Sequence, residues 1–263
     1  MPASLHDSLA ARLDRLAPVK EVAQIGAVIG REIPYALLAA VAERSEGQLQ
    51  QALDQLVDSE LLHRRGAPPD AIYMFKHALV RDAAYASLLR SRRQQMHARV
   101  ASVLEERFPE TPPELLAHHL SEAGLDERAA AAWARAGRAA LGRSAMREAA
   151  TSLSLAVRLL RRMPATPERQ RSELGLLAGL GVALTNTRGP ASPEAREVHE
   201  RAGHLAESLG DREGRFRARW NLWRVHNVRA EFDQAIGIGE ALLREAETEG
   251  DVAHEIQARH ALW

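Results

Sequence analysis

The sequence has no cysteine at any of its 263 positions. This absence excludes a disulfide framework, a thiolate-ligated zinc or iron–sulfur site, and a cysteine nucleophile. Long apolar runs are also missing, since no window approaches about 18 consecutive apolar residues and charged side chains interrupt the leucines near the start. We therefore expect a cytoplasmic protein with no signal peptide, no transmembrane helix and no membrane partner.

Net charge is zero, because 35 basic side chains balance 35 acidic ones. A neutral chain has no global attraction to nucleic acid or anionic lipid, so only local patches could bind either. Aromatic residues make up only 4% of the chain. Alanine, leucine, arginine and glutamate dominate instead and favour helices, so the composition predicts a nearly all-α fold with one small β element. At roughly 100 to 200 residues per domain, the length allows two domains or one extended array.

Helix signals open the chain, and one β-hairpin interrupts them. Ser4 is an N-cap for a first helix, and the capping-box spacing at Ser45–Gln48 opens a later one. Leu61–Arg65 and Ala71–Phe75, separated by a turn-rich loop, predict the two strands of a hairpin. Helices followed by a hairpin are the order of a winged-helix module, so we expect a winged-helix domain with trailing helices over residues 1–108. Its predicted helices include Val19–Gly30, Tyr35–Glu43, Ser45–Glu60, His77–Leu89 and Ser91–Phe108.

Proline marks the expected end of that domain, since three of the five residues in Pro109–Pro113 are prolines and cannot continue a helix. Beyond it, turn and cap residues recur at the spacing of antiparallel helix pairs. The second-helix alanines Ala149, Ala195 and Ala235 give periods of 46 and 40 residues by subtraction. We expect an α-solenoid of lengthened tetratricopeptide-like repeats over residues 109–263, truncated at the C-terminus. The residues that match the repeat pattern are Trp133, Gly137, Ala149, Leu153 and Ala156, then Leu180, Gly181, Leu184, Ala195 and Ala202, then Leu222, Phe232, Asp233, Ala235 and Ile236.

Catalytic patterns are absent from the sequence. It contains no G-x-x-x-x-G-K-[ST] phosphate loop, no H-E-x-x-H and no G-x-S-x-G. Adjacent helical residues point about 100° apart, so the pair His118–His119 is not expected to ligate one metal ion. The carboxylates of Glu105 and Glu106 are expected to be solvated on a charged helical surface. We therefore predict a chain that is not an enzyme, with no catalytic residue, no metal site and no cofactor of its own.

A winged helix raises the question of DNA binding. The helix expected at Ser45–Glu60 would be the recognition helix, and it carries four acidic residues and no lysine or arginine. Cationic side chains supply much of the affinity for duplex phosphates, so this surface repels DNA. Its four glutamines could still read bases, and Arg64 and Arg65 in the wing could meet phosphate. A DNA-binding transcriptional regulator with a helical-repeat sensor is the alternative function, although nucleic acid is not the partner we expect.

One stretch of the expected winged helix resembles a known family. Tyr73–Tyr85 (YMFKHALVRDAAY) and Arg92–His97 (RRQQMH) are similar to segments of the winged-helix region in bacterial signal-transduction ATPases with numerous domains, the STAND class. The likeness is greatest to multidomain proteins that join a class III adenylate/guanylate cyclase domain, an AAA-type ATPase, a winged helix and tetratricopeptide-like repeats. It covers most of the chain from Ser4 to Pro164, and the later repeats only generically.

The resemblance implies a regulatory and protein-interaction module. In this class, a histidine at the start of the helix after the wing senses the β-phosphate of bound ADP, and the matching residue here is His77. An imidazole N–H can donate to an anion, which suits this role. The alternative is that His77 caps its helix or packs against the hairpin. The resemblance also implies a preceding ATPase domain, outside this chain, that uses ATP and ADP, and a protein or small-molecule inducer on the repeats.

Overall fold

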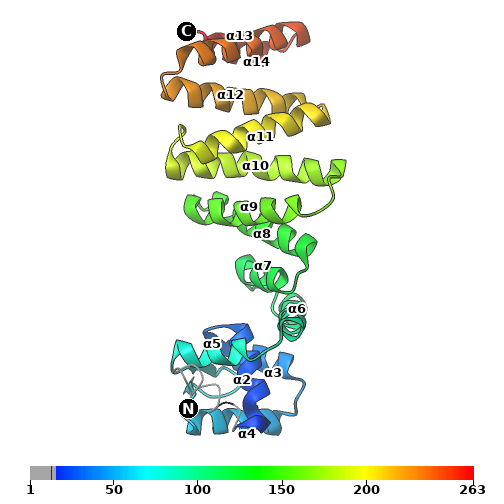
Figure 1. The fold of residues 1–263 in the computed structure, drawn as a ribbon, viewed down its shortest axis with the longest axis vertical. Helices are drawn as coiled ribbons and strands as arrows, with labels where there is room; N and C mark the ends of the chain where they lie inside the picture. Colours follow the sequence, from blue (N-terminus) through cyan, green and yellow to red (C-terminus); the bar gives the residue numbers. More distant parts are fainter. Residues whose placement is uncertain (1–12, 14–15) are drawn as a thin grey trace. The chain divides into compact units, whose positions relative to one another are not determined.

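Figure 1 shows the computed structural model of the chain, which describes Leu13 and residues 16–263. The N-cap expected at Ser4 lies outside the described residues. As predicted, the described chain is mostly helical, with one small antiparallel sheet and a series of helical repeats. It divides into two compact units, which we call unit 1 (Met1–Leu125) and unit 2 (Asp126–Trp263).

The division falls later in the chain than Pro109–Pro113, where the sequence places the domain boundary. That proline-rich segment joins α6 (Arg90–Arg107) to α7 (Pro113–Glu122), and the two helices pack against each other inside unit 1. Pro113 occupies the first turn of α7, where its missing N–H leaves no hydrogen bond unmade. The prolines therefore end one helix and begin the next within the same unit.

The helices of unit 1 begin and end close to their predicted residues. The capping box of α4 is complete, because the Gln48 backbone N–H donates to the Ser45 hydroxyl and the Ser45 N–H donates to the Gln48 side chain. The helices are α2 (Ala17–Ile29), α3 (Tyr35–Ala42), α4 (Glu46–Asp58), α5 (Ala78–Ala86), α6 and α7.

A three-stranded antiparallel sheet in the order β1-β3-β2 accompanies these helices. The predicted hairpin is confirmed, since β2 (Leu62–Arg65) pairs with β3 (Ile72–Phe75). The third strand, β1 (Glu32–Pro34), is not predicted by the sequence, because three residues that end in proline show no strand periodicity. It pairs with β3 so that Ile33 lies opposite Tyr73, and both side chains are almost fully buried.

Close packing of α2 on the sheet depends on a glycine. A Cβ atom on Gly26 would lie 2.8 Å from the Cδ1 atom of Ile33, well inside van der Waals contact. Burying a side chain of this size contributes roughly 1.5 to 3 kcal/mol, so the contact is part of what holds the sheet to the helices. The glycine therefore allows α2 to pack closely against β1.

Unit 2 is a succession of antiparallel helix pairs, and in Figure 1 its helices stack one on the next from α8 to α14. Two of its helices have side-chain caps, since Thr166 and Ser192 each accept a hydrogen bond from a backbone N–H in the first turn of a helix that begins with proline. The helices are α8 (Asp126–Gly142), α9 (Met146–Arg161), α10 (Pro167–Arg188), α11 (Pro193–Leu209), α12 (Arg212–Val228), α13 (Phe232–Glu249) and α14 (Val252–Ala261).

Small residues let the paired helices of unit 2 approach closely. A Cβ atom on Gly137 of α8 would lie 2.5 Å from the Cγ atom of Leu153 on α9, and Ala149 and Ala156 are fully buried. These are residues that the repeat pattern singles out, and they form the contact it predicts. None of the helices in the described part of the chain is both long enough and apolar enough to span a bilayer.

Two pattern residues of the last pair lie off the packed face. Phe232 is 57% exposed and Ile236 is 50% exposed. The buried side of α13 includes Ala235 and Leu242, and Ile236 points about 100° away from its neighbour Ala235 around the helix. Phe232 is the first residue of the helix. The repeat register therefore describes the last pair only in part.

Candidate functional site

His77 lies between β3 and α5, at the residue that directly precedes the helix. Its backbone is extended, with φ −133° and ψ 137°, and its side chain makes no capping hydrogen bond. The imidazole is exposed. His77 is therefore an exposed residue that does not cap its helix through its side chain.

The acidic residues of α4 and of the turn that follows it are exposed on unit 1. One of them, Asp54, accepts a hydrogen bond of 2.9 Å from Gln50 and lies 3.7 Å from the Arg64 guanidinium. One of the two arginines of β2 is therefore already beside a carboxylate. The helix α4 presents negative charge next to a strand whose positive charge is partly neutralised.

Two histidines form a buried hydrogen-bonded chain in unit 1. His97 on α6 is 1% exposed and His119 on α7 is 0% exposed, and their Nδ1 atoms lie 2.9 Å apart. The other ring nitrogen of His97, Nε2, lies 3.1 Å from the hydroxyl of Tyr85 on α5. That hydroxyl is 3.5 Å from a carboxylate oxygen of Glu122. This series of hydrogen bonds therefore connects α5, α6 and α7.

Burial keeps both imidazoles neutral. Desolvation, together with the charge of neighbouring histidines, lowers the pKa of His97 to about 4 and the pKa of His119 to about 3. Two neutral rings share an N–N hydrogen bond only if one nitrogen carries the proton and the other a lone pair. Every bond in the chain has one donor if His119 donates to His97, His97 to Tyr85, and Tyr85 to Glu122. The Nε2 atom of His119 is then a buried acceptor with no hydrogen-bond partner among the residues that the structure describes.

The adjacent pair His118–His119 is not arranged around a common point. His118 is exposed while His119 is buried, and their ring centroids lie 5.4 Å apart with an interplanar angle of 61°. In the part of the chain that the structure describes, no three histidine, aspartate or glutamate side chains are grouped so that they could hold a metal ion.

One buried carboxylate in unit 2 accepts hydrogen bonds from three arginines. Glu173 on α10 has no exposed side-chain surface, and Arg161, Arg169 and Arg201 donate to it at distances of 2.6 to 3.1 Å. Burial raises the pKa of Glu173, but the hydrogen bonds and positive charges of Arg201 and Arg161 outweigh it and hold that pKa below its usual value. Because the arginines come from α9, α10 and α11, the charged carboxylate ties three successive helices together.

Two adjoining cavities follow the first helices of the pairs in unit 2. One, of about 600 Å³, lies along α8 and α10, and the other, of about 390 Å³, lies along α10, α11 and α12. They share Arg171 and Gly175 on α10, and we call the two cavities together the repeat groove. Its lining combines alanine and leucine side chains with eight charged ones, which include Arg138 and Arg217. A concave surface that combines apolar side chains with polar groups is typical of a binding site.

The sequence predicts His77 as a site residue and predicts the helices that line the repeat groove. It does not predict the two buried clusters, at His97 and at Glu173. The only local signal is the four-residue spacing of Arg169 and Glu173 on one helix. The contacts from His97 to His119 and from Arg201 to Glu173 join residues 22 and 28 positions apart. Helical periodicity carries no information about such pairs.

Known proteins resemble this chain distantly in sequence. It is 29% identical over 264 residues to an uncharacterized protein of Rhizobium meliloti. The match covers 97% of this chain, and the chain spans about a quarter of the length of that relative. No protein-family model matches the chain.

Likenesses to solved structures are also distant. The chain is similar to a STAND protein with a tetratricopeptide repeat sensor from Pyrococcus horikoshii, with 12% identity and a TM-score of 0.44 over 93% of this chain and 46% of that one. It is similar to BtubC from P. vanneervenii, with 12% identity and a TM-score of 0.33 over 98% of this chain and 92% of that one. Similarity at this level says nothing about function.

Proposed function

We propose that this chain is a non-catalytic regulatory and interaction module of a multidomain signal-transduction ATPase linked to a class III adenylate/guanylate cyclase. In this proposal, unit 1 is a winged helix that relays the state of the ATP or ADP held by a preceding ATPase domain. Unit 2 is a tetratricopeptide-like sensor that binds a protein or small-molecule inducer. A relative about four times as long as the chain is consistent with a module of a larger protein.

The order of elements in unit 1 supports the winged-helix assignment. A helix, a strand, two helices and two strands follow one another, and the early strand β1 pairs beside β3 in one antiparallel sheet. The observation that carries the proposal is the exposed imidazole of His77, which stands uncapped between this sheet and α5. An N–H in that place can donate to a phosphate oxygen that a neighbouring domain presents.

The repeat groove supports the sensor assignment, because its two cavities lie along three first helices of the helix pairs, α8, α10 and α12. An inducer that binds more tightly to the open state of the whole protein shifts a closed-to-open equilibrium. In the closed state His77 donates to the β-phosphate of ADP. Opening removes that hydrogen bond, and ADP leaves.

The DNA-binding alternative is less well supported by the charges of unit 1. The exposed acids of α4 would face the phosphates, and Arg64 of the wing already lies beside Asp54. Base reading by glutamines would have to overcome this repulsion.

Replacing His77 with alanine in the full-length protein is expected to raise the dissociation rate of ADP by about tenfold or more, because one charge-assisted hydrogen bond to phosphate contributes about 1.5 to 3 kcal/mol. Stopped-flow release of a fluorescent ADP analogue measures this rate. Basal signalling output should rise with it.

A His63→Ala variant is the matched control, since His63 is an exposed histidine on the neighbouring strand β2. Its ADP release should equal that of the unsubstituted protein. Equal release from the His77→Ala variant and the unsubstituted protein would contradict the proposed role of His77.

A further inference from the structure

A cavity lies within unit 1, and His77 is not part of its lining. It has a volume of about 630 Å³ and opens between α2, α3, α4 and α6. Apolar side chains, including Ile25, Val41 and Met96, contribute to its lining. The rest of the lining is mainly polar and combines guanidinium, carboxylate and amide groups. We call this cavity the arginine groove.

Three arginines and two glutamates set the charge of the arginine groove. Glu21 accepts hydrogen bonds from Arg44 at 2.9 Å and from Arg92 at 3.2 Å, while Arg99 pairs with Glu43 at 2.7 Å. The lining therefore has one positive charge in excess of its carboxylates. Because the Glu43 side chain is 76% exposed, its ion pair with Arg99 contributes little and can be exchanged for another carboxylate.

Exposed amides from two helices also line the arginine groove. Gln51 and Gln55 lie four residues apart on α4 and so share one face of that helix, and Gln95 lies on α6. A glutamine amide both donates and accepts, which is the pattern that a peptide group needs on each side. The groove therefore offers partners for a main chain as well as for acidic side chains.

We propose that the arginine groove binds an extended acidic segment of a partner protein. Carboxylates of the segment pair with Arg44, Arg92 and Arg99, and its main-chain amides bond with the glutamines of α4 and α6. A duplex fits less well, because residues 1–125 carry 14 basic and 16 acidic side chains, and the outer acids of α4 would meet its phosphates. A single extended segment touches only the groove.

Fluorescence anisotropy of the whole chain with a labelled peptide of alternating glutamate and alanine tests this proposal at low ionic strength. Binding is expected, and Arg92→Ala or Arg99→Ala should each raise its Kd about tenfold, the effect of one lost charge-assisted hydrogen bond. A Gln51→Ala/Gln55→Ala double variant should also weaken binding several-fold although it removes no charge. Arg92 and the glutamines are exposed, and circular dichroism checks that each variant stays folded.

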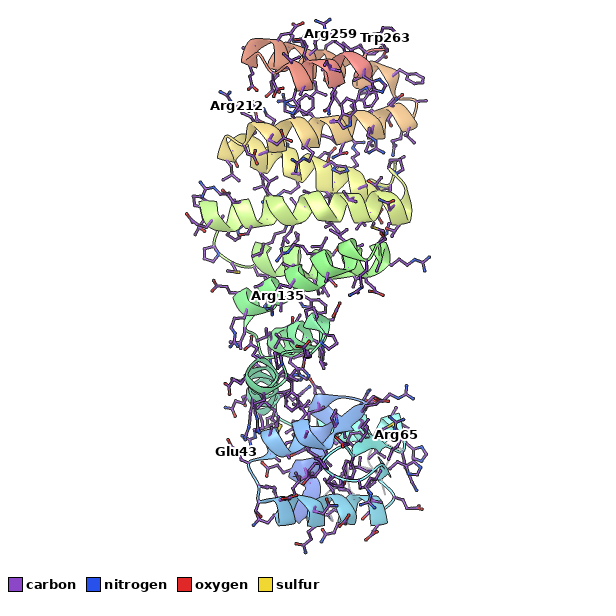
Figure 2. All side chains as sticks on the ribbon, turned by 180° about the vertical axis from the view of Figure 1, so that it is seen from behind. Glu43, Arg65, Arg135, Arg212, Arg259 and Trp263 are labelled. Atoms are coloured by element: carbon purple, nitrogen blue, oxygen red, sulfur yellow. The ribbon has the colours of Figure 1, made fainter. Side chains whose placement is uncertain are left out.

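Arg65→Ala is the matched control, because Arg65 is an exposed arginine of β2 and lies on the opposite side of unit 1 from Glu43 in the view of Figure 2. Its Kd should be unchanged, and a lysine–alanine peptide should not bind. Three outcomes would overturn the proposal: no binding of the acidic peptide, equal weakening by Arg65→Ala, or tighter binding of random duplex DNA than of the peptide.

Discussion

A Glu173→Ala variant is expected to lower the free energy of unfolding of unit 2 by about 3 to 5 kcal/mol, the cost of breaking a buried ion pair from one side. The loss is large because one carboxylate pairs with three guanidiniums from α9, α10 and α11. Arg169 is itself buried, at 9% exposure, so its charge would lack both a partner and water. Replacement by glutamine should also be costly, since an amide accepts at only one of its two ends.

Tryptophan fluorescence during urea unfolding measures this effect, because all four tryptophans of the chain belong to unit 2. Glu240→Ala is the control, since Glu240 pairs with Arg244 on an exposed face of α13 and should change the free energy by no more than about 0.5 kcal/mol. Equal urea midpoints for the Glu173 and Glu240 variants would show that the buried cluster contributes nothing to the stability of unit 2.

Acid is expected to weaken unit 1 well before most of its carboxylates are protonated. His97 and His119 have folded pKa values of about 4 and about 3, against 6.5 for an unperturbed histidine. Above pH 6.5 both rings are neutral in the folded and unfolded chain. As the pH falls from 6.5 towards 4, both histidines become protonated in the unfolded chain but stay mostly neutral in the folded chain. Each histidine therefore lowers the free energy of unfolding by about 3 kcal/mol by pH 4.

Hydrogen exchange in α6 and α7, followed by mass spectrometry at pH 7 and pH 5, tests this prediction after correction for the intrinsic pH dependence of exchange. Protection of both helices should fall at the lower pH. An Asn substitution at His119 should reduce the pH dependence, whereas His63→Ala on the exposed strand should leave it intact. Protection that is independent of pH would show that the two rings do not stay neutral in the fold.

Local signals in the sequence are enough to predict most of the fold. Capping residues such as Ser45, Thr166 and Ser192 fix where helices begin, because they satisfy backbone N–H groups within one turn. The strand β1 is not predicted, because only its pairing with β3 makes it a strand. Likewise, Ile236 lies off the packed face because the neighbouring helices decide which side of α13 is buried.

Some of the candidate sites can likewise be predicted from local signals in the sequence, and others depend on how the helices pack. The position of His77 follows from the order of hairpin and helix, both of which the sequence reveals. The arginine groove does not follow, because its walls come from four helices whose packing brings Arg44 of one segment to Glu21 of another. The buried bonds at His97 and Glu173 depend equally on helix packing. Contacts between residues far apart in the sequence produce no periodic pattern from which they could be predicted.

Our central proposal is that this chain works as a module beside an ATPase domain. Reading the genomic sequence immediately upstream of the first codon tests that claim most directly. We predict an open frame that continues upstream and encodes a G-x-x-x-x-G-K-[ST] phosphate loop, because such a loop would hold the phosphates of the nucleotide that we propose His77 senses. An in-frame stop codon directly upstream, with no phosphate loop encoded beside it, would contradict the account.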